Sequence, residues 1–331
     1  MDCIEVIQIG MGPLGRNITK FIAERQTIKV VGAVDMDPAI QGQDLGGLCG
    51  LSPMGFVVQH SLEACLETTK AQAVLLTTVS SMAGITPQIE AILRHKLPVV
   101  STCEELVYPW DDGPELAARV DLAAKNAGVA VLGTGVNPGF LMDSLPTYLT
   151  AVCQRVEKIK VSRIQDATFR RIPFQKKIGA GLTLEQFERK KADGSLRHVG
   201  LKESTQLIAG ALGWRLDRTE DVISPVVADR EIKTDALTIP AGRASGVQQI
   251  GRGWINGEEK ITLFFKAAVG EPESRDTVEI QGEPSITSTI PGGVNGDVAT
   301  CAIVLNALKQ ILRVSPGLRT MADMPLIAFS G

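Results

Sequence analysis

Six residues near the N-terminus have the types and the spacing of a phosphate-binding turn. Gly10, Gly12 and Gly15 follow the apolar run Glu5–Ile9, and a helical pattern starts at Leu14. Between a strand and a helix, the first glycine permits a tight turn, the second lets a pyrophosphate approach the backbone, and the third allows close packing. The helix start then offers free N–H groups and its positive dipole end to the phosphates. The predicted dinucleotide site consists of Gly10, Met11, Gly12, Pro13, Leu14 and Gly15.

A carboxylate stands where the ribose of such a dinucleotide would lie. Asp35 ends the next apolar run, Val30–Asp35, 20 residues after Gly15. At that spacing an acidic side chain accepts hydrogen bonds from the adenosine ribose hydroxyls, and it repels a 2′-phosphate. We therefore expect NAD as the cofactor. Met36 supplies no charge for a 2′-phosphate, whereas Arg16 could, so NADP remains an alternative. The preceding strand and the spaced carboxylate disfavour a glycine turn that binds no ligand.

Hydroxyl-bearing residues end the apolar run Ala73–Thr78 and continue to Ser81. Ligands of parallel sheets bind at the carboxyl ends of the strands. Thr77 and Thr78 are therefore candidates for contacts with the pyrophosphate or the nicotinamide ribose. Alternatively, the segment only caps the helix that the pattern predicts over Ile85–His95.

Two adjacent carboxylates, Glu104 and Glu105, follow the apolar run Pro98–Thr102. A carboxylate at this point would face the nicotinamide, where it could act as a general base. Alternatively, the pair begins a solvated turn that leads to Tyr108.

A loop rich in glycine and proline, Gly133–Phe140, follows the next apolar run. Asn137 could exchange hydrogen bonds with a substrate or with the nicotinamide carboxamide, and Pro138 beside it is expected to contact the cofactor. The alternative is a hinge without ligand contact. The expected substrate pocket comprises Asn137, Phe140, Gly179, Ala180 and His198.

The first 135 residues alternate short apolar runs with helical patterns. Runs of four to six apolar residues indicate strands buried on both faces, and such strands separated by helices form a doubly wound parallel sheet. The expected strands are Glu5–Ile9, Val30–Asp35, Ala73–Thr78, Pro98–Thr102 and Val129–Leu132. The expected helices are Leu14–Glu24, Leu62–Thr68, Ile85–His95 and Glu115–Asn126. The sequence thus predicts an N-terminal Rossmann-type α/β domain.

After about residue 140, longer runs mix apolar and charged positions, which indicates a largely antiparallel open sheet in an α+β domain. Asn256-Gly257 lies between two such runs and predicts a two-residue hairpin, because both residues tolerate positive φ. The expected strands are Glu157–Ile164, Asp221–Ile232, Ala244–Ile255, Lys260–Val269 and Asp276–Glu283. The expected helices are Thr183–Lys191, Val199–Leu212 and a last apolar helix, Asp297–Ile311, capped by Asp297.

Composition excludes several classes of protein. A chain of 331 residues suggests two domains. The net charge of −3 argues against a nucleic-acid or anionic-membrane partner, and no apolar run approaches the roughly 20 residues of a membrane helix. The N-terminus does not have the pattern of a signal peptide. Six cysteines without a CxxC pair indicate a reduced, cytoplasmic protein, and three scattered histidines give no reason to expect a metal.

Several of these segments resemble the 2,4-diaminopentanoate dehydrogenases and the native amine dehydrogenases related to them. In the first domain the resemblance lies in Ile9–Gly15, Val34–Pro38, Thr102–Leu106 and Gly135–Phe140. In the second it lies in Arg171–Leu182 and His198–Ser204. It therefore covers most of the chain. The glycine turn is generic, whereas the Glu-Glu-Leu, Asn-Pro-Gly-Phe and Gly-Ala-Gly-Leu segments together are more specific.

The resemblance implies a fold like that of dihydrodipicolinate reductase. A dinucleotide-binding domain, residues 1–140, would be joined by the C-terminal helical segment 297–331, and residues 141–296 would form a substrate-binding and dimerisation domain. It also implies a homodimer that reversibly converts an amine or diamino acid into a ketone or aldehyde plus ammonia, with NAD or NADP. The family's catalytic glutamate falls on Glu104, with Glu105 as the second candidate. The paired histidines and nearby lysine of the true dihydrodipicolinate reductases have no counterpart, which disfavours their reaction.

This chemistry fits the residues independently of the resemblance. One carboxylate can accept a proton from ammonium, assist the loss of water and stabilise an iminium cation. Two other interpretations share the cofactor motifs. One is a different dehydrogenase, such as an amino-acid dehydrogenase or an imine reductase, and the other is a non-catalytic NAD-binding protein.

Overall fold

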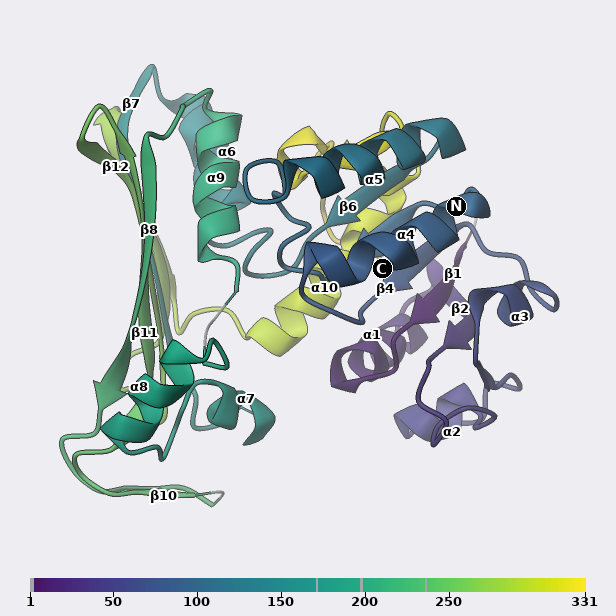
Figure 1. The fold of residues 1–331 in the computed structure, drawn as a ribbon, viewed down its shortest axis with the longest axis horizontal. Coiled ribbons are helices and arrows are strands. Elements are labelled where there is room, and N and C mark those ends of the chain that lie inside the picture. Colours follow the sequence, from purple (N-terminus) through teal and green to yellow (C-terminus); the bar gives the residue numbers. More distant parts are fainter. Residues whose placement is uncertain (1–2, 171, 197–198, 236) are drawn as a thin grey trace. The chain divides into compact units, whose positions relative to one another are not determined.

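The computed structural model describes residues 3–170, 172–196, 199–235 and 237–331 (Figure 1). The chain forms two compact units. The first contains Met1–Phe140 and Asn295–Gly331, and the second contains Leu141–Val294. Each unit has its own β-sheet and its own apolar core, as an independently packed domain requires.

The first unit is built on a seven-stranded sheet with the order β15-β6-β5-β4-β1-β2-β3. All neighbouring strands in it are parallel. The strands are β1 (Ile4–Ile9), β2 (Ile28–Val34), β3 (Val58–Gln59), β4 (Ala73–Leu76), β5 (Val99–Ser101), β6 (Ala130–Gly133) and β15 (Gly317–Arg319). Every residue of β4, β5 and β6 is buried, because both faces of the sheet are covered. The predicted doubly wound α/β fold is confirmed.

Helices connect these strands. They are α1 (Pro13–Ala23), α2 (Leu45–Cys49), α3 (Leu62–Leu66), α4 (Met82–Arg94), α5 (Pro114–Ala127) and α10 (Gly296–Ile311), followed by the short η2 (Met321–Asp323). Helices α4 and α5 pack against each other, and α1 packs against α10, which also contacts β5 and β6. In β4, Val74 and Leu76 share a core cluster with α4 and α5, whereas Ala73 and Leu75 are fully buried on the opposite face.

The element boundaries differ from the expected ones in identifiable ways. Asn295 is the N-cap of α10, since its Oδ1 accepts hydrogen bonds from the N–H groups of Asp297 and Val298. The expectation that Asp297 caps this helix was therefore wrong. Strands β3 and β15, which are two and three residues long, are not among the expected strands.

The second unit is built on a six-stranded sheet with the order β14-β13-β7-β12-β11-β8. Neighbouring strands are antiparallel, except for the parallel pair β7–β12. The strands are β7 (Arg155–Asp166), β8 (Arg218–Val227), β11 (Ala244–Ile255), β12 (Glu258–Ala268), β13 (Arg275–Glu283) and β14 (Ile286–Pro291). The largely antiparallel sheet is as predicted. The strand expected over Asp221–Ile232 instead ends at Val227, and Ile232 begins a small separate hairpin of β9 (Ile232–Lys233) and β10 (Thr238–Ile239).

One face of this second sheet carries helices, and Figure 1 shows α8 and α9 along it. The helices of the unit are α6 (Ser144–Leu149), η1 (Thr150–Val152), α7 (Ile172–Lys177), α8 (Leu184–Ala192) and α9 (Leu201–Ala211). The predicted hairpin between β11 and β12 is confirmed: Asn256 and Gly257 have φ of 53° and 75°.

Candidate active site

Three glycines shape the turn between β1 and α1. Gly10 has φ +90°, and a Cβ there would lie 2.6 Å from the Thr77 carbonyl oxygen. A Cβ at Gly15 would collide with the Gly10 carbonyl oxygen. In contrast, a Cβ at Gly12 would meet nothing within 4 Å. The outer glycines are therefore required by packing, while the middle one leaves open space above the backbone.

The start of α1 is suited to an anion. Gly12 is its N-cap and provides no side-chain cap, Pro13 occupies the first turn, and that turn contains no acidic residue. The N–H groups of a first helical turn have no partner within the helix, and the helix dipole favours a negative charge beside them. Arg16 steadies the turn, because its Nε donates to the Met11 carbonyl oxygen at 2.9 Å. The residues present fit a dinucleotide pyrophosphate.

Asp35 follows β2 and reaches back to the same turn. Its Oδ2 accepts from the Met11 N–H at 2.6 Å, and its Oδ1 accepts from the Asp37 N–H at 2.8 Å. Met36 beside it is 86% exposed. The structure therefore places the acidic side chain predicted for the ribose against the predicted phosphate turn, with an uncharged neighbour.

Gln8 is a residue of this site that the sequence analysis missed. It is fully buried in β1, and its Nε2 donates to the Thr77 Oγ1 at 2.8 Å and to the Gly10 carbonyl oxygen at 3.2 Å. Thr77 Oγ1 in turn donates to the Gly10 carbonyl oxygen at 2.8 Å. Gln8 thus ties the glycine turn to the loop after β4. The feature of the sequence that could have indicated Gln8 is its position between two isoleucines, in a strand whose central residues are buried.

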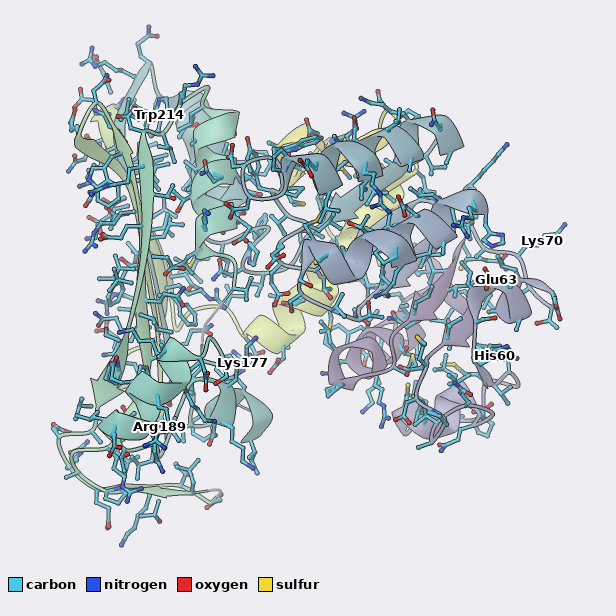
Figure 2. The ribbon with its side chains drawn as sticks, in the orientation of Figure 1. His60, Glu63, Lys70, Lys177, Arg189 and Trp214 are labelled. Atoms are coloured by element: carbon cyan, nitrogen blue, oxygen red, sulfur yellow. The ribbon has the colours of Figure 1, made fainter. Side chains whose placement is uncertain are left out.

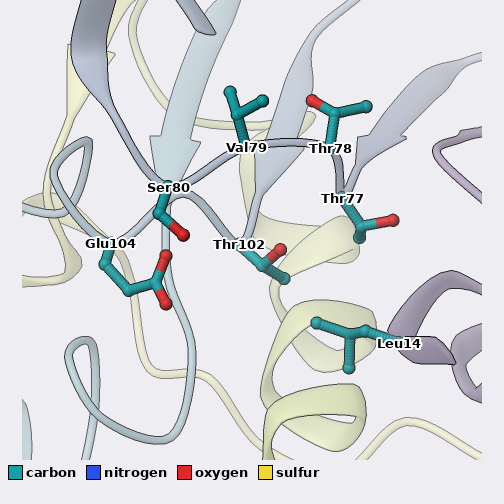
Figure 3. A pocket seen from close by; sticks show the side chains of 7 residues that line it. All are labelled: Leu14, Thr77, Thr78, Val79, Ser80, Thr102 and Glu104. Carbon is teal, nitrogen blue, oxygen red and sulfur yellow. The ribbon is translucent and has the colours of Figure 1, made fainter. Parts of the chain in front are cut away.

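A cavity of about 170 Å³ opens beside this turn, within the first unit. It is lined by the start of α1 and by the loops after β4 and β5 (Figure 3). The lining residues are Leu14, Thr77, Thr78, Val79, Ser80, Thr102 and Glu104. Four hydroxyl groups and one carboxylate therefore meet at the carboxyl ends of adjacent parallel strands, where ligands of such sheets bind. Ser81, also in the loop after β4, caps α4 by accepting from the Gly84 N–H.

The two neighbouring glutamates point to different places. Glu104 lines the cavity, and Figure 3 shows its carboxylate and the Ser80 hydroxyl turned toward the same space. Glu105 instead accepts a hydrogen bond from the Met82 N–H, at 2.7 Å from its Oε2. Of the two candidates for proton transfer, only Glu104 is among the residues lining this cavity.

The strand end before Glu104 is held firmly. Ser101 Oγ donates to the Leu76 carbonyl oxygen at 3.0 Å and accepts from the Cys103 N–H at 3.1 Å. Cys103 is fully buried, and burial raises the pKa of its thiol to about 12. The thiol is therefore protonated near neutral pH and does not compete with Glu104 as a base.

Within the described ranges, the loop after β6 contains a buried amide without a hydrogen-bond partner. Asn137 Nδ2 and Oδ1 are both buried and have no hydrogen-bond partner among the described residues, and the same is true of Thr134 Oγ1. A buried amide without partners costs free energy, which a ligand carboxamide could recover. Pro138 is buried and Phe140 half-buried. None of these residues lines the cavity around Glu104.

The remaining predicted pocket residues belong to the second unit. Gly179 has φ +79° and packs against Leu196 and Phe187, and the N–H of Ala180 donates to the Gln175 carbonyl oxygen at 3.1 Å. Their role in a substrate pocket stays a prediction. His198 lies outside the described residues.

No group of three or more His, Cys, Asp or Glu side chains in the described parts of the chain is arranged to hold a metal ion. His60 is exposed (Figure 2), and His95 Nε2 lies 3.6 Å from Glu63 Oε1. The helices within the described ranges are all too short or too polar to cross a membrane.

The chain is similar to known proteins along most of its length. Residues 140–330 match the family model of the 2,4-diaminopentanoate dehydrogenase C-terminal domain, and residues 4–103 match that of the dihydrodipicolinate reductase N-terminus. The chain is 32% identical to the 2,4-diaminopentanoate dehydrogenase of Acetoanaerobium sticklandii, over 98% of this chain and 94% of that protein. It is 22% identical to an amine dehydrogenase of Streptomyces virginiae, over 98% and 96% of the two chains.

Among solved structures, an amine dehydrogenase from Mycobacterium smegmatis is similar along almost the whole chain. The TM-score is 0.84, with 20% identity, and the match covers 99% of this chain and 97% of the other. At that level of identity the likeness shows the fold.

Proposed function

Because the chain belongs to the 2,4-diaminopentanoate dehydrogenase family, we propose that it is an NAD(P)-dependent amine dehydrogenase. In the oxidative direction, a primary amine or diamino acid, water and the oxidised cofactor give a ketone or aldehyde, ammonia, the reduced cofactor and a proton. The reverse direction is reductive amination.

One observation carries this proposal. The Glu104 carboxylate lines a polar cavity beside the glycine turn, and no hydrogen bond or ion pair ties it to another group among the described residues. A carboxylate that is available in a cavity can exchange protons with a bound amine. The structural arrangement therefore supports proton transfer next to a nucleotide site.

Glu104 transfers protons and stabilises positive charge during the reaction. It takes a proton from the alkylammonium substrate, because an amine must be neutral before its carbon can release hydride. Glu104 passes this proton to solvent, and its restored negative charge then stabilises the positive iminium carbon–nitrogen unit electrostatically. It next accepts a proton from the water that adds to the iminium and delivers that proton to the nitrogen, so that ammonia can leave. The bound cofactor supplies the acceptor for the hydride.

Residues of the first unit would hold the cofactor. The N–H groups at the start of α1 would bind the pyrophosphate over Gly12, and Asp35 would accept from the adenosine ribose hydroxyls. Thr77 and Thr78 would contact the cofactor from the loop after β4, and Asn137 and Pro138 would do so from the loop after β6. NAD is the expected cofactor, with NADP as the alternative.

We also propose that the chain forms a homodimer through its second unit. We propose further that it acts in the cytoplasm, in keeping with six cysteines that form no CxxC pair. The substrate class is small amines, including diamino acids, and the roles predicted for Phe140, Gly179 and Ala180 in binding them stay predictions.

A cofactor-reduction screen tests the activity. The protein is incubated with NAD⁺ or NADP⁺ and panels of primary amines, diamino acids, α-amino acids and alcohols, and the absorbance of the reduced cofactor is followed. We expect turnover with amines or diamino acids, and the reverse reaction with the matching carbonyl compound and ammonium. Turnover with α-amino acids alone would instead indicate an amino-acid dehydrogenase. Cofactor binding without turnover on any panel would indicate a non-catalytic NAD-binding protein.

A further inference from the structure

Glu104 and Glu105 occupy the centre of one tight turn. The Leu106 N–H donates to the Cys103 carbonyl oxygen at 3.2 Å, which closes a four-residue turn around the two glutamates. Cys103 and Leu106, the residues that flank them, are both fully buried in the core of the first unit. The ends of the turn are therefore fixed, and the two central side chains must leave it in different directions.

The turn lies close against β6. A Cβ at Gly133 would lie 2.6 Å from the carbonyl carbon of Leu106 and 2.8 Å from the Val107 nitrogen. The absence of a side chain at Gly133 thus allows the turn to sit directly on the sheet. On this side the position of the turn is determined by backbone packing.

Glu105 attaches the other side of the turn to the loop after β4. Its N–H donates to the Ser80 carbonyl oxygen at 3.2 Å, and its Oε2 accepts from the Met82 N–H at 2.7 Å. Met82 is the first residue of α4, so its N–H has no partner within the helix, and a carboxylate is the strongest acceptor for it. Both contacts involve one residue, and together they join the two loops that line the cavity.

We propose that Glu105 is a positioning residue, whose carboxylate holds the start of α4 and thereby fixes Glu104 opposite Ser80 in the cavity. Ser80 precedes Met82 by two residues, and Glu104 precedes Glu105 by one. A shift of the start of α4 relative to the turn therefore changes the spacing of Ser80 and Glu104 directly. This inference rests on the proposed function of Glu104.

Two substitutions separate positioning from catalysis. Glu105→Gln removes the negative charge but keeps a side-chain oxygen that can accept from the Met82 N–H. Glu105→Ala removes the acceptor altogether. Glu115→Ala is the matched control, because Glu115 is an acidic residue in the first turn of α5 and lies outside the turn Cys103–Leu106.

The experiment measures kcat and KM for an amine substrate, the Kd of NAD, and the amide hydrogen exchange of the peptide that begins α4. We expect Glu105→Ala to lower kcat by about 10- to 100-fold, since small displacements of a catalytic group have effects of that order. Its NAD affinity should be unchanged and its exchange at Met82 faster. Glu105→Gln should restore most of the kcat and the slow exchange, and Glu115→Ala should behave as wild type.

Two kinetic results would overturn the inference. If Glu105→Gln is as slow as Glu105→Ala, the charge of Glu105 itself takes part in catalysis. If Glu105→Ala has wild-type kcat despite faster exchange, Glu105 only caps the helix. The amide-exchange measurement does not depend on the proposed function. Unchanged exchange at Met82 in Glu105→Ala would reject the attachment of Glu105 to α4, even if the wild-type protein oxidises no amine.

Discussion

Glu104 differs from the other carboxylates near the glycine turn in what its oxygen atoms do. Asp35 accepts from the N–H groups of Met11 and Asp37, and Glu105 accepts from the Met82 N–H. Glu104 instead lines the cavity with its carboxylate free of such contacts in the described structure. A general base must reach the proton that it removes, so geometry selects Glu104.

We predict that Glu104→Gln lowers the kcat of amine oxidation by about 10²–10⁴-fold, or roughly 3–5 kcal/mol in the barrier. The amide keeps the shape of the side chain but removes the base and the charge that stabilises the iminium. NAD affinity should be unchanged, because the glycine turn and Asp35 bind elsewhere. Turnover is followed by cofactor absorbance and NAD binding by calorimetry, with Glu105→Gln as the matched control. Wild-type turnover in Glu104→Gln would reject the carboxylate mechanism.

The preference for NAD over NADP also depends on single residues. Asp35 places a negative charge beside the turn, and Met36 supplies no positive charge. We predict that the double variant Asp35→Ser, Met36→Arg shifts the ratio of kcat/KM values for NADP and NAD toward NADP by about 10- to 100-fold, because a hydrogen bond to a charged group contributes roughly 1.5–3 kcal/mol.

Met36→Arg alone is the control for this exchange, since it adds the positive charge but keeps Asp35. It should change the cofactor ratio less than the double variant does. An unaltered ratio in the double variant would show that Asp35 does not face the ribose.

At the scale of elements, two glycines of the turn between β1 and α1 differ in the space available for a side chain. A methyl group at Gly15 has no room beside the Gly10 carbonyl oxygen, whereas one at Gly12 enters open space. We predict that Gly15→Ala lowers the free energy of unfolding by about 1–3 kcal/mol, the usual cost of overpacking.

Gly12→Ala should instead unfold like wild type but bind NAD more weakly, because the methyl group occupies the space of the pyrophosphate. Thermal unfolding and calorimetric NAD binding of the two variants check both statements. Equal unfolding temperatures for the two variants would contradict the packing argument.

A buried ion pair lies at the end of the second unit, where the chain leaves β14. Arg163 Nη1 lies 3.2 Å from Asp276 Oδ1, and Asp276 Oδ2 and Arg163 Nη2 bind the N–H and the carbonyl oxygen of Val294. Burial lowers the pKa of Arg163 to about 10 and raises the pKa of Asp276, so loss of hydration outweighs the attraction between the two charges. With a pKa of about 10, the Arg163 guanidinium is nonetheless charged at neutral pH.

We predict that Arg163→Met lowers the free energy of unfolding by about 3–5 kcal/mol, because it leaves the buried Asp276 carboxyl without its partner. The double variant Arg163→Met, Asp276→Leu should recover part of this loss, since both costs of dehydration are then removed. Urea unfolding of the two variants measures the difference. A double variant that is no more stable than Arg163→Met would mean that the bonds to Val294 dominate.

Much of this element structure follows from the sequence, and the exceptions have physical causes. The runs at Ala73–Thr78 and Pro98–Thr102 predict β4 and β5, because strands buried on both faces have no polar alternation. The two-residue β3 and the end of β8 at Val227 leave no comparable pattern.

The candidate site is likewise predictable from the sequence only in part. The glycine turn and the Glu-Glu pair are visible in the sequence, because they follow strand ends directly. The sequence does not indicate which glutamate faces the cavity, since that depends on how the turn at Cys103–Leu106 directs its side chains. It also does not indicate that Gln8 joins β1 to the loop after β4, because that hydrogen bond spans 69 positions in the chain.

At the scale of the whole molecule, the second sheet has one face without helices among the described residues. On β12, Ile261, Leu263 and Phe265 are buried in the core under the helices. Strand alternation therefore places Lys260, Thr262, Phe264 and Lys266 on the opposite face, from which side chains also project (Figure 2).

On this opposite face, apolar side chains at the centre are surrounded by charged side chains. Phe264 is paired with Ile250 on β11, and both are half-buried. Around them run cross-strand ion pairs, Lys158–Glu259 and Lys160–Glu279, each at 2.8 Å. Exposed ion pairs contribute little to the stability of the folded unit. This face can therefore pair with an equivalent face of a second chain, with the two apolar centres in contact.

We therefore predict a homodimer that is held through this face of the second unit. Light scattering at micromolar concentration should give about twice the chain mass of 35.3 kDa. Phe264→Lys should shift the protein toward the monomer without changing its circular dichroism, because the side chain lies outside the core of its own unit. Leu122→Lys is the control, since Leu122 is a 60% exposed residue on α5 in the first unit, and it should leave the mass unchanged. A wild-type mass near 35.3 kDa would reject the dimer, and a dimeric Phe264→Lys variant would place the interface on another surface.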